Sequence, residues 1–293
     1  MNRTAARAMV AAAVVVDVVL VVGLMNHVNR TPPSSPDLPR ASVTEPAASA
    51  APVDQDVYAF KPAQAATMSM SNDGTLLFAT RGQCDGDDAA KLVVSTNGGV
   101  STSTPTTGLQ EILAVSAASR TELRVVGADG TCAIKKLVSS DGGDTWTADT
   151  DNTLWHPGLN DPEQVVSPDG ASKPGCTVTS LSQIGADFAR ASCADGSIRG
   201  TGNGGKKWFK LGRLDNVRVA SFSSFNAGYA LAVYQGCAAQ EFTTRDSGRT
   251  WSPGGCISGE PAQAIEANDT GLVALVDSQL YASDDGGKAW SQP

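Results

Sequence analysis

Short apolar runs alternate with polar turns along most of this chain. The clearest example has apolar runs over residues 217–223, 229–234 and 240–244, separated by turns at Asn226 and Gly236. The same succession of runs and turns fits four other segments, residues 64–98, 112–143, 177–205 and 262–287. Runs of about five residues with regular turn signals are typical of all-β propellers and sandwiches. We therefore expect repeated units of four short strands each.

Every unit ends in the same short polar motif. It begins with Ser or Thr, continues with Asp or Asn and a Gly-rich pair, and in most copies closes on Trp. The copies start at Ser95, Ser139, Thr201, Thr244 and Ser283. They recur with a period of about 40 residues, which indicates a repeat architecture of stacked or radially arranged units. The interval between the second and third copies is longer than the others.

The motif makes physical sense as a tight turn between two strands. Asp or Asn followed by Gly tolerates the positive φ angles of a tight reversal, and its side chain accepts hydrogen bonds from nearby amides. The side chains at this position are Asn97, Asp141, Asn203, Asp246 and Asp285. An acidic ligand site is the alternative interpretation, but asparagine in two copies would suit repeated acid chemistry poorly. We therefore interpret all five residues as structural.

This motif resembles the Asp-box, or BNR repeat, of sialidase-like β-propellers, whose relatives include sortilin-type receptors and photosystem II assembly factors. The resemblance covers residues 56–293 and implies an all-β propeller of four-stranded blades. We expect five blades; the alternative of six requires an extra blade within residues 147–200. Because residues 177–205 align with the other repeats, a long loop insertion over residues 149–175 is favoured instead. Residues 56–60 are expected to pair with the last blade and close the ring.

An apolar segment precedes the repeats. Residues 8–25 carry Asp17 as their only charge, which predicts one transmembrane helix at the short end of the usual length range. Arg3 and Arg7 come before this segment, so the positive-inside rule places the N-terminus in the cytoplasm. No small-residue cleavage site follows closely, which favours an uncleaved anchor over a removed signal peptide.

Three regions follow from this pattern. Residues 1–25 are the cytoplasmic start and transmembrane signal anchor, residues 26–55 a Pro-, Ala- and Ser-rich linker, and residues 56–293 the propeller. The prolines of the linker favour an extended, semi-rigid chain. We therefore expect a single-pass protein of the cell membrane whose C-terminal domain is extracytoplasmic.

All six cysteines lie after the apolar segment. An even number of cysteines in an oxidising compartment suggests three disulfides and no metal site, since no zinc-like spacing of Cys and His occurs. Four occupy equivalent turns between second and third strands, and Cys176 and Cys256 lie in connections between repeats. All six are thus expected at the blade ends opposite the polar turns. The preferred pairs are Cys84–Cys132, Cys176–Cys193 and Cys237–Cys256.

Candidate binding residues follow from the same alignment. The insertion contributes Trp155 and His156, and long loops on a rigid scaffold commonly carry binding sites. Arg81 and Arg190 each precede a register-equivalent cysteine by a few residues, and Tyr234 takes the matching place in the fourth repeat. We expect these residues near one rim. Contact of the arginines with an acidic ligand is one interpretation, and the favoured interpretation is that they are solvated rim residues.

The resemblance stops short of the sialidase catalytic set. That family implies three arginines, one of them in an Arg-Ile-Pro motif, and a Tyr nucleophile assisted by Glu, with an Asp as acid/base. The chain contains no Arg-Ile-Pro, and none of its tyrosines has a matching context. His156 is the sole candidate base in the repeat region for a Ser-His-Asp or Cys-His hydrolase. A net charge of −8 disfavours nucleic acid as a partner.

We therefore expect a membrane-anchored, extracytoplasmic β-propeller that acts as a binding or scaffold module for an envelope protein or glycan, without cofactor or metal. The alternative is a glycoside hydrolase with a divergent active site. Two carboxylates about 5–9 Å apart in an axial cleft would favour the hydrolase. A shallow surface with an exposed Trp155 would favour binding.

Overall fold

The computed structural model describes residues 65–293 apart from Asn152 and Thr270. These residues belong to one compact unit, Asp54–Pro293. Their regular elements are all β-strands, and none of their segments is a helix long and apolar enough to cross a membrane. The predicted transmembrane segment 8–25, the linker and the closing strand 56–60 lie outside the described residues.

Five larger antiparallel sheets follow one another along the chain. Their first strands are β1 (Ala66–Met70), β4 (Glu111–Ala117), β11 (Val178–Gln183), β15 (Val217–Ser221) and β19 (Ala262–Ala267). The second strands are β2 (Leu76–Thr80), β5 (Leu123–Ala128), β12 (Ala189–Cys193), β16 (Gly228–Tyr234) and β20 (Leu272–Val276). The third strands are β3 (Lys91–Ser95), β6 (Ile134–Ser139), β13 (Ser197–Thr201), β17 (Cys237–Thr244) and β21 (Gln279–Ser283).

Fourth strands complete three of these sheets. They are β7 (Thr147–Ala148), β14 (Phe209–Arg213) and β18 (Ser252–Ile257). In the first and last sheets a single bridge replaces the fourth strand, from Val94 to Ser103 and from Ala282 to Ser291. The expected unit of four strands is therefore complete in three sheets and reduced to its first three strands in the other two.

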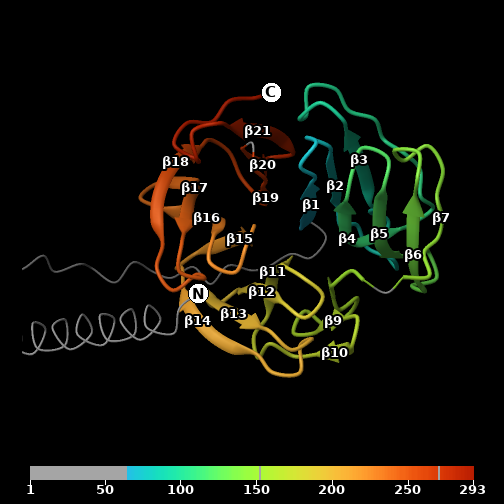
Figure 1. Ribbon diagram of the computed structural model, residues 1–293, viewed down its shortest axis with the longest axis horizontal. Helices are drawn as coiled ribbons and strands as arrows, with labels where there is room; N and C mark the ends of the chain where they lie inside the picture. Colours follow the sequence, from blue (N-terminus) through green and yellow to red (C-terminus); the bar gives the residue numbers. More distant parts are fainter. Residues whose placement is uncertain (1–64, 152, 270) are drawn as a thin grey trace, which may run out of the picture. The chain divides into compact units, whose positions relative to one another are not determined.

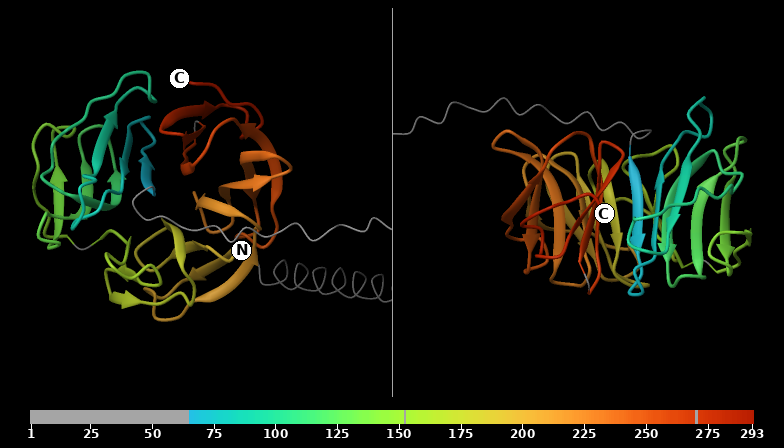
Figure 2. Two further views of the ribbon diagram at one scale, coloured as in Figure 1. Left: turned by 180° about the vertical axis from the view of Figure 1, so that it is seen from behind. Right: turned by 90° about the horizontal axis from the view of Figure 1, so that it is seen from above.

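The first strands of the five sheets face a common axis, and the sheets succeed one another around it (Figure 1). A side view shows the strands running along this axis (Figure 2). β1 packs beside both β4 and β19, and the apolar cluster of Met68, Phe78, Val273 and Leu275 joins the last sheet to the first. The ring therefore closes within the described residues, and its arrangement is that of a β-propeller.

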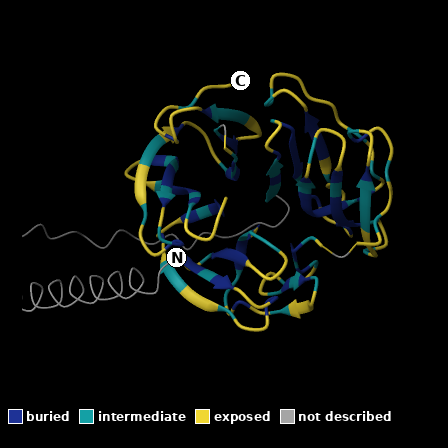
Figure 3. Cartoon of the chain, in the orientation of Figure 1, coloured by how far each residue is buried: buried dark blue, intermediate teal, exposed yellow. Residues whose placement is uncertain are grey.

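Burial decreases outward along each sheet (Figure 3). The first and second strands are mostly buried, as in β5 and β20, while the outer strands β14 and β18 are largely exposed. Side chains of adjacent sheets share apolar clusters, such as the one in which Val219 and Leu231 meet Ile265 and Leu272. Burial of this apolar surface between sheets is the main stabilising contribution to the fold.

The region between the second and third repeats differs from the expected loop insertion. It forms a small sheet of its own from β8 (His156–Pro157), β9 (Val165–Ser167) and β10 (Gly170–Ser172). Residues 154–157 lie between β4 and β11. The insertion is therefore a folded part of the domain, and the prediction of a loop was wrong because Trp155, Val165 and neighbouring side chains supply an apolar cluster.

The two ends of the sheets carry different features. We call the end with the five Gly-rich turns the turn face; antiparallel pairing places the turns between first and second strands there too. We call the opposite end the disulfide face. The insertion crosses between them: Trp155 N donates to Gln183 Oε1 at the turn face, and Gly158 O accepts from Arg81 Nη2 at the disulfide face. The short strand β8 thus runs opposite to β4 and β11.

Three disulfides join Cys84 to Cys132, Cys176 to Cys193, and Cys237 to Cys256. These are the pairs preferred from the sequence, and their Cα atoms are 5.2, 5.9 and 6.0 Å apart. The first bridge links the first sheet to the second. One position differs from expectation: Cys256 lies within the fourth strand β18 and not in a connection between repeats, because that strand extends as far as Ile257.

Candidate functional site

The polar turns use their acidic groups internally. In the second repeat, Ser139 Oγ donates to Asp141 Oδ1 and accepts from Gly143 N, while Thr145 N donates to the same Asp141 oxygen. Thr244 and Asp246 repeat this pattern. The glycine pair adopts positive φ in the second copy, 79° at Gly142 and 100° at Gly143. The side chains of these turns are thus engaged in holding the reversal.

Hydrogen bonding keeps the turn carboxylates ionised. Donation from Thr145 lowers the pKa of Asp141 to about 2, and donation from Thr250 lowers the pKa of Asp246 to about 2. Asp285 has its pKa lowered in the same way by Ala289 N and Ser283. Asn97 and Asn203 accept the equivalent bonds without a charge. The acceptor oxygen is therefore the shared requirement, and the charge is not.

An axial cavity of about 380 Å³ runs between the first strands. Its volume falls in the range of small-molecule and side-chain binding pockets. All five larger sheets contribute to its wall, and the insertion adds Leu154, Trp155 and Pro157. Glu266 is the only carboxyl among the described residues that line it, and Arg81 is the only cation.

The cavity wall contains a repeated position near its turn-face end. In each sheet, strand pairing sets one residue at the end of the first strand level with the first residue of the polar motif. The residue that precedes it in the sequence is the repeated position. These five residues are Ser69, Ser116, Ser182, Ser221 and Glu266. The hydroxyls join neighbouring sheets: Ala117 N donates to Ser69 Oγ at 3.0 Å, and Phe222 N donates to Ser182 Oγ at 2.8 Å. The last repeat alone carries a carboxyl here.

Glu266 has an unusual environment for a glutamate. Its Oε1 accepts from Ser221 Oγ at 2.9 Å and from Ala267 N at 3.2 Å. Among the described residues no donor bonds its Oε2, and no cation pairs with it. Burial therefore raises the pKa of Glu266 to about 7, with those two hydrogen bonds opposing the shift. At neutral pH this carboxyl exchanges readily between its neutral and charged forms.

Two exposed aromatic side chains lie at the turn face, and a Cβ built on Gly185, which lines the cavity, would be 3.9 Å from the ring of Phe188. Phe188 lies in the turn after β11 and Phe225 in the turn after β15, with exposed fractions of 36% and 48%. Their ring centroids are 4.6 Å apart in an edge-to-face arrangement. Ile184 and Phe222, at the starts of the same turns, line the cavity. An exposed aromatic pair beside a cavity is well suited to contact a ligand.

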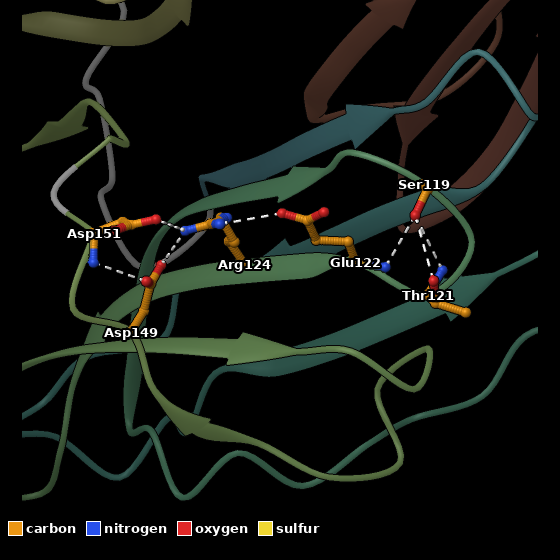
Figure 4. A network of polar contacts seen from close by, with 6 residues as sticks. All are labelled: Ser119, Thr121, Glu122, Arg124, Asp149 and Asp151. Carbon is orange, nitrogen blue, oxygen red and sulfur yellow. Dashed lines mark hydrogen bonds and ion pairs between the residues drawn. The ribbon is translucent and has the colours of Figure 1, made fainter.

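The start of the insertion is fixed by an ion-pair network on the second sheet (Figure 4). Arg124 of β5 lies between Glu122 on one side and Asp149 and Asp151 on the other. Its Nη1 is 2.7 Å from Asp149 Oδ2, and its Nη2 is 3.1 Å from Glu122 Oε1. This network holds the chain against β5 just before it enters the cavity wall.

Trp155 and His156 are buried, with exposed fractions of 3% and 5%. Trp155 Nε1 donates to Ala186 O, and its ring packs edge-on against Trp208 at 6.1 Å. Burial lowers the pKa of His156, and its Nδ1 lies 2.9 Å from Pro157 O. Trp155 lines the cavity, but it is not the exposed surface residue that a shallow binding face would require.

The two candidate arginines are also buried, at 7% for Arg81 and 9% for Arg190. Arg81 Nε is 2.7 Å from Glu111 Oε1, and its Nη2 donates to the carbonyls of Gly158 and Leu159. Arg190 lies over the Phe222 ring. The interpretation of both as solvated rim residues was therefore wrong, because partners from other repeats enclose them.

Tyr234 is the one exposed member of the predicted set, at 41%, and it lies at the disulfide face beside Cys237. Arg81 and Trp155 both line the cavity, Arg81 at the disulfide face and Trp155 at the turn face. His156, Arg190 and Tyr234 do not line it. The structure thus does not gather the five predicted binding residues into one rim.

Another carboxyl with a raised pKa lies away from the cavity, between the last two sheets. Glu241 of β17 is fully buried, and its Oε1 accepts from Thr243 Oγ1 at 2.8 Å. Its Oε2 has no hydrogen-bond partner among the described residues. A Cβ added at Gly254 or Gly287 would collide with this side chain, so glycine at both positions makes room for it. Burial raises the pKa of Glu241 to about 7.

Glu266, Phe188 and Phe225 are absent from the sequence-based prediction. The equivalence of Glu266 with the serines of the other repeats comes from strand pairing, because the number of residues between this position and the polar motif differs from repeat to repeat. The aromatic pair likewise has no signal in the sequence, since its two turns come together only in the folded ring.

In the part of the chain that the structure describes, no three His, Cys, Asp or Glu side chains gather into a possible metal site. All six cysteines are in disulfides. The side-chain groups of the cavity wall that could act as ligand oxygens are hydroxyls, amides and the single carboxyl of Glu266.

No family model and no curated protein matches this sequence. Solved structures with a similar fold include YCF48 bound to D1 peptide, 19% identical over 64% of this chain and 55% of that chain, with a TM-score of 0.33. YCF48 from Cyanidioschyzon merolae is 15% identical over 80% and 86%, with a TM-score of 0.33. A lectin of Aleuria aurantia in complex with Fucalpha1-6GlcNAc is 12% identical over 80% and 96%, with a TM-score of 0.46. Such distant similarity identifies neither a family nor a ligand for this chain.

Proposed function

We propose that this protein is a membrane-anchored, extracytoplasmic binding or scaffold module that recognises an envelope protein or glycan. The domain is a five-bladed Asp-box propeller with a small inserted sheet, held outside the membrane by the anchor at residues 8–25 and the linker 26–55. The single observation that carries the binding function is the axial cavity with the exposed pair Phe188 and Phe225 at its turn-face end.

The blade count of five rests on strand direction and on the motifs. Each of the five larger sheets has a polar motif after its third strand, and β8 runs opposite to the first strands beside it. The small sheet is therefore better described as an insertion than as a sixth blade. Three disulfides support an oxidising location outside the cytoplasm.

The binding surface is assigned to the turn face. Of the five residues predicted from the sequence, four are buried, and the exposed Tyr234 lies at the opposite end. Exposed aromatic side chains beside a cavity offer contact area at a small cost in conformational entropy. The cavity supplies hydroxyls and one carboxyl that fix orientation, which is the usual division between apolar area and a few polar groups.

The hydrolase alternative lacks a supporting observation. A pair of carboxyls about 5–9 Å apart is needed for the usual glycosidase mechanisms. Glu266 stands alone among the described residues of the cavity wall. We therefore keep binding as the proposed function.

Site-specific photocrosslinking in the native membrane tests this proposal. The full-length protein carries a photoreactive phenylalanine analogue at position 225, or at position 209 as a control. Phe209 is 51% exposed on the outer strand β14, away from the cavity. We expect one stoichiometric envelope partner to be captured from position 225 and not from position 209. Capture from neither position, or equally from both, would contradict the proposed binding face.

Point changes test the same face without disturbing the fold. Deleting residues 149–175 would be a poor test, since Trp155 and Val165 are part of the core. The double substitution Phe188→Ala and Phe225→Ala removes the exposed aromatic pair, and Phe209→Ala is its control. Co-purification of the partner is expected to fall about tenfold in the double variant and to stay unchanged in the control. A loss of this size corresponds to the binding free energy of a modest aromatic contact.

A further inference from the structure

Glu266 interrupts a pattern that the other four repeats obey. Serines at the equivalent positions are short, and two of them accept an amide from the next sheet, which ties neighbouring first strands together. Ser221 Oγ donates a hydrogen bond to Glu266, and this bond goes to Oε1. A longer side chain at this place is unnecessary for joining the sheets, and it brings a carboxyl to the wall of the cavity.

The charge of Glu266 has no counterpart among the side chains that the structure describes. Arg81, the one cation among the described lining residues, is 2.7 Å from Glu111 and lies at the disulfide-face end of β2. Glu266 lies near the turn-face end of β19. When ionised, Glu266 therefore leaves the cavity with an uncompensated negative charge, which favours a cation from outside.

The walls near Glu266 limit the shape of that cation. Ala220, Ala264 and Ile265 contribute apolar surface, and the hydroxyls of Ser182 and Ser221 can accept hydrogen bonds. An ammonium group has three donors and an apolar stem, which matches one carboxyl oxygen, a few hydroxyls and an apolar wall. A guanidinium has five donors in a planar fork and needs more acceptors than this set offers.

We propose that the turn-face end of the axial cavity receives a lysine side chain from a protein partner, with its ammonium group paired to Glu266 and its stem beside Phe188 and Phe225. This inference rests on the proposed binding function and specifies its ligand. The acidic character of the chain, with a net charge of −8, is complementary to a basic segment of the partner. The aromatic pair can add a cation–π or apolar contact at the entrance.

Binding of a minimal lysine probe to the full-length protein in detergent tests the inference. The probe is Nα-acetyl-lysine methylamide, and Nα-acetyl-norleucine methylamide is its uncharged counterpart. At pH 8 we expect the lysine probe to bind at least tenfold more tightly than the norleucine probe by NMR titration. Equal binding of the two, or no binding of the lysine probe, would overturn the inference.

Substitutions locate the contact. Glu266→Gln keeps the shape and Glu266→Ser restores the residue of the other repeats, so at least one folded variant is expected. Both should weaken lysine-probe binding about tenfold, while Glu260→Gln, which changes an exposed glutamate outside the cavity, should leave it unchanged. Unaltered binding in the Glu266 variants would contradict the assignment, as would Glu266-dependent binding of a chito-oligosaccharide in place of the lysine probe.

The pH profile provides a readout that needs no variant. Glu266 is the only carboxyl among the described lining residues, and no histidine is among them. Lysine-probe affinity should rise between pH 6 and pH 8 as Glu266 loses its proton. A flat profile would overturn the inference.

If the photocrosslink from position 225 survives while the lysine probe does not bind, only this inference is wrong. If neither result is obtained, the proposed binding function itself is contradicted.

Discussion

Asp141 and Asp246 in the polar turns and Glu241 and Glu266 in the interior belong to one domain, yet they receive very different numbers of hydrogen bonds. Each aspartate accepts bonds from a hydroxyl on either side and from backbone amides, although it is at the surface. Glu241 Oε2 has no hydrogen-bond partner among the described residues, and the two hydrogen bonds to Glu266 both go to Oε1. The pKa values therefore move in opposite directions, to about 2 and about 7.

This difference separates carboxyls that stabilise the fold from a carboxyl that is available to a ligand. The turn carboxylates have their acceptor capacity filled by their own chain, so they offer little to a ligand. Glu266 keeps a free oxygen in a cavity, and burial makes its charge costly until a cation arrives. The conspicuous acidic motif thus serves the fold, and the inconspicuous glutamate is the better candidate for recognition.

The largest expected effect is on the pH dependence of stability. Glu241 has an ordinary pKa of 4.5 and a folded pKa of about 7, so the folded state binds its proton more tightly. Stability from this group is fully present below about pH 4.5 and is lost as pH rises through 7, by about 3 kcal/mol in all. Urea unfolding of Glu241→Gln should show a much flatter profile from pH 4.5 to 8. A parallel profile in the variant would contradict the raised pKa.

The loss of stability at low pH should depend on the aspartates of the polar turns. Asp141 and Asp246 have an ordinary pKa of 3.8 and folded values of about 2, so their stabilising effect is present above about pH 4 and is lost as pH falls toward 2. For these two aspartates and the two glutamates taken alone, the stabilising contribution is greatest near pH 4–5. The double variant Asp141→Asn and Asp246→Asn should have a flatter acid limb in calorimetry. An unchanged limb would mean that these carboxylates do not titrate as described.

A smaller effect is expected from a single turn. Asp246→Ala removes the acceptor for Thr244, Arg249 and Thr250, whereas Asp246→Asn keeps an acceptor oxygen, as Asn97 and Asn203 do. We expect Asp246→Ala to lower Tm by about 2–4 °C and Asp246→Asn to lower it less, since water replaces most of the hydrogen bonds lost at this exposed side chain and the net loss is about that of one bond. The reverse order would show that the charge, and not the acceptor, is what the turn requires.

The smallest effect concerns the one side chain that supports Glu266. Ser221→Ala removes the hydroxyl that donates to Glu266 Oε1 and leaves the Ala267 amide in place. Because this bond favours the ionised form, its loss should raise the pKa of Glu266 slightly further. A carboxyl ¹³C NMR titration measures the change, and Ser116→Ala, at the equivalent position of the second repeat, is the matched control. A lowered midpoint in Ser221→Ala would contradict the hydrogen-bond assignment.

Local signals in the sequence account well for the strands and turns. The runs over residues 217–244 became β15, β16 and β17, because their apolar residues are bounded by Asn226 and Gly236. The disulfide pairs also agree with the prediction, although Cys256 lies in β18 and not in the expected connection between repeats. The prediction of a loop over residues 149–175 failed because Trp155 packs against Trp208, a contact that no local pattern announces.

The candidate site depended on contacts between distant repeats. Arg81 is buried because Glu111 and two carbonyls of the insertion surround its guanidinium, which its position near Cys84 does not reveal. Phe188 and Phe225 meet only when adjacent sheets stand side by side. Glu266 is equivalent to serine in the other repeats only through the pairing of the strands, which the unequal turn lengths hide in the sequence.

The most direct test of the contrast is a ¹³C NMR titration of the Asp and Glu carboxyls in the full-length protein. The Glu266 resonance is assigned from its loss in Glu266→Gln, and those of Asp141 and Asp246 from their asparagine variants. We expect midpoints of about 7 for Glu266 and about 2 for the two turn aspartates. A Glu266 midpoint near 4.5, in the range of an ordinary exposed glutamate, would contradict it.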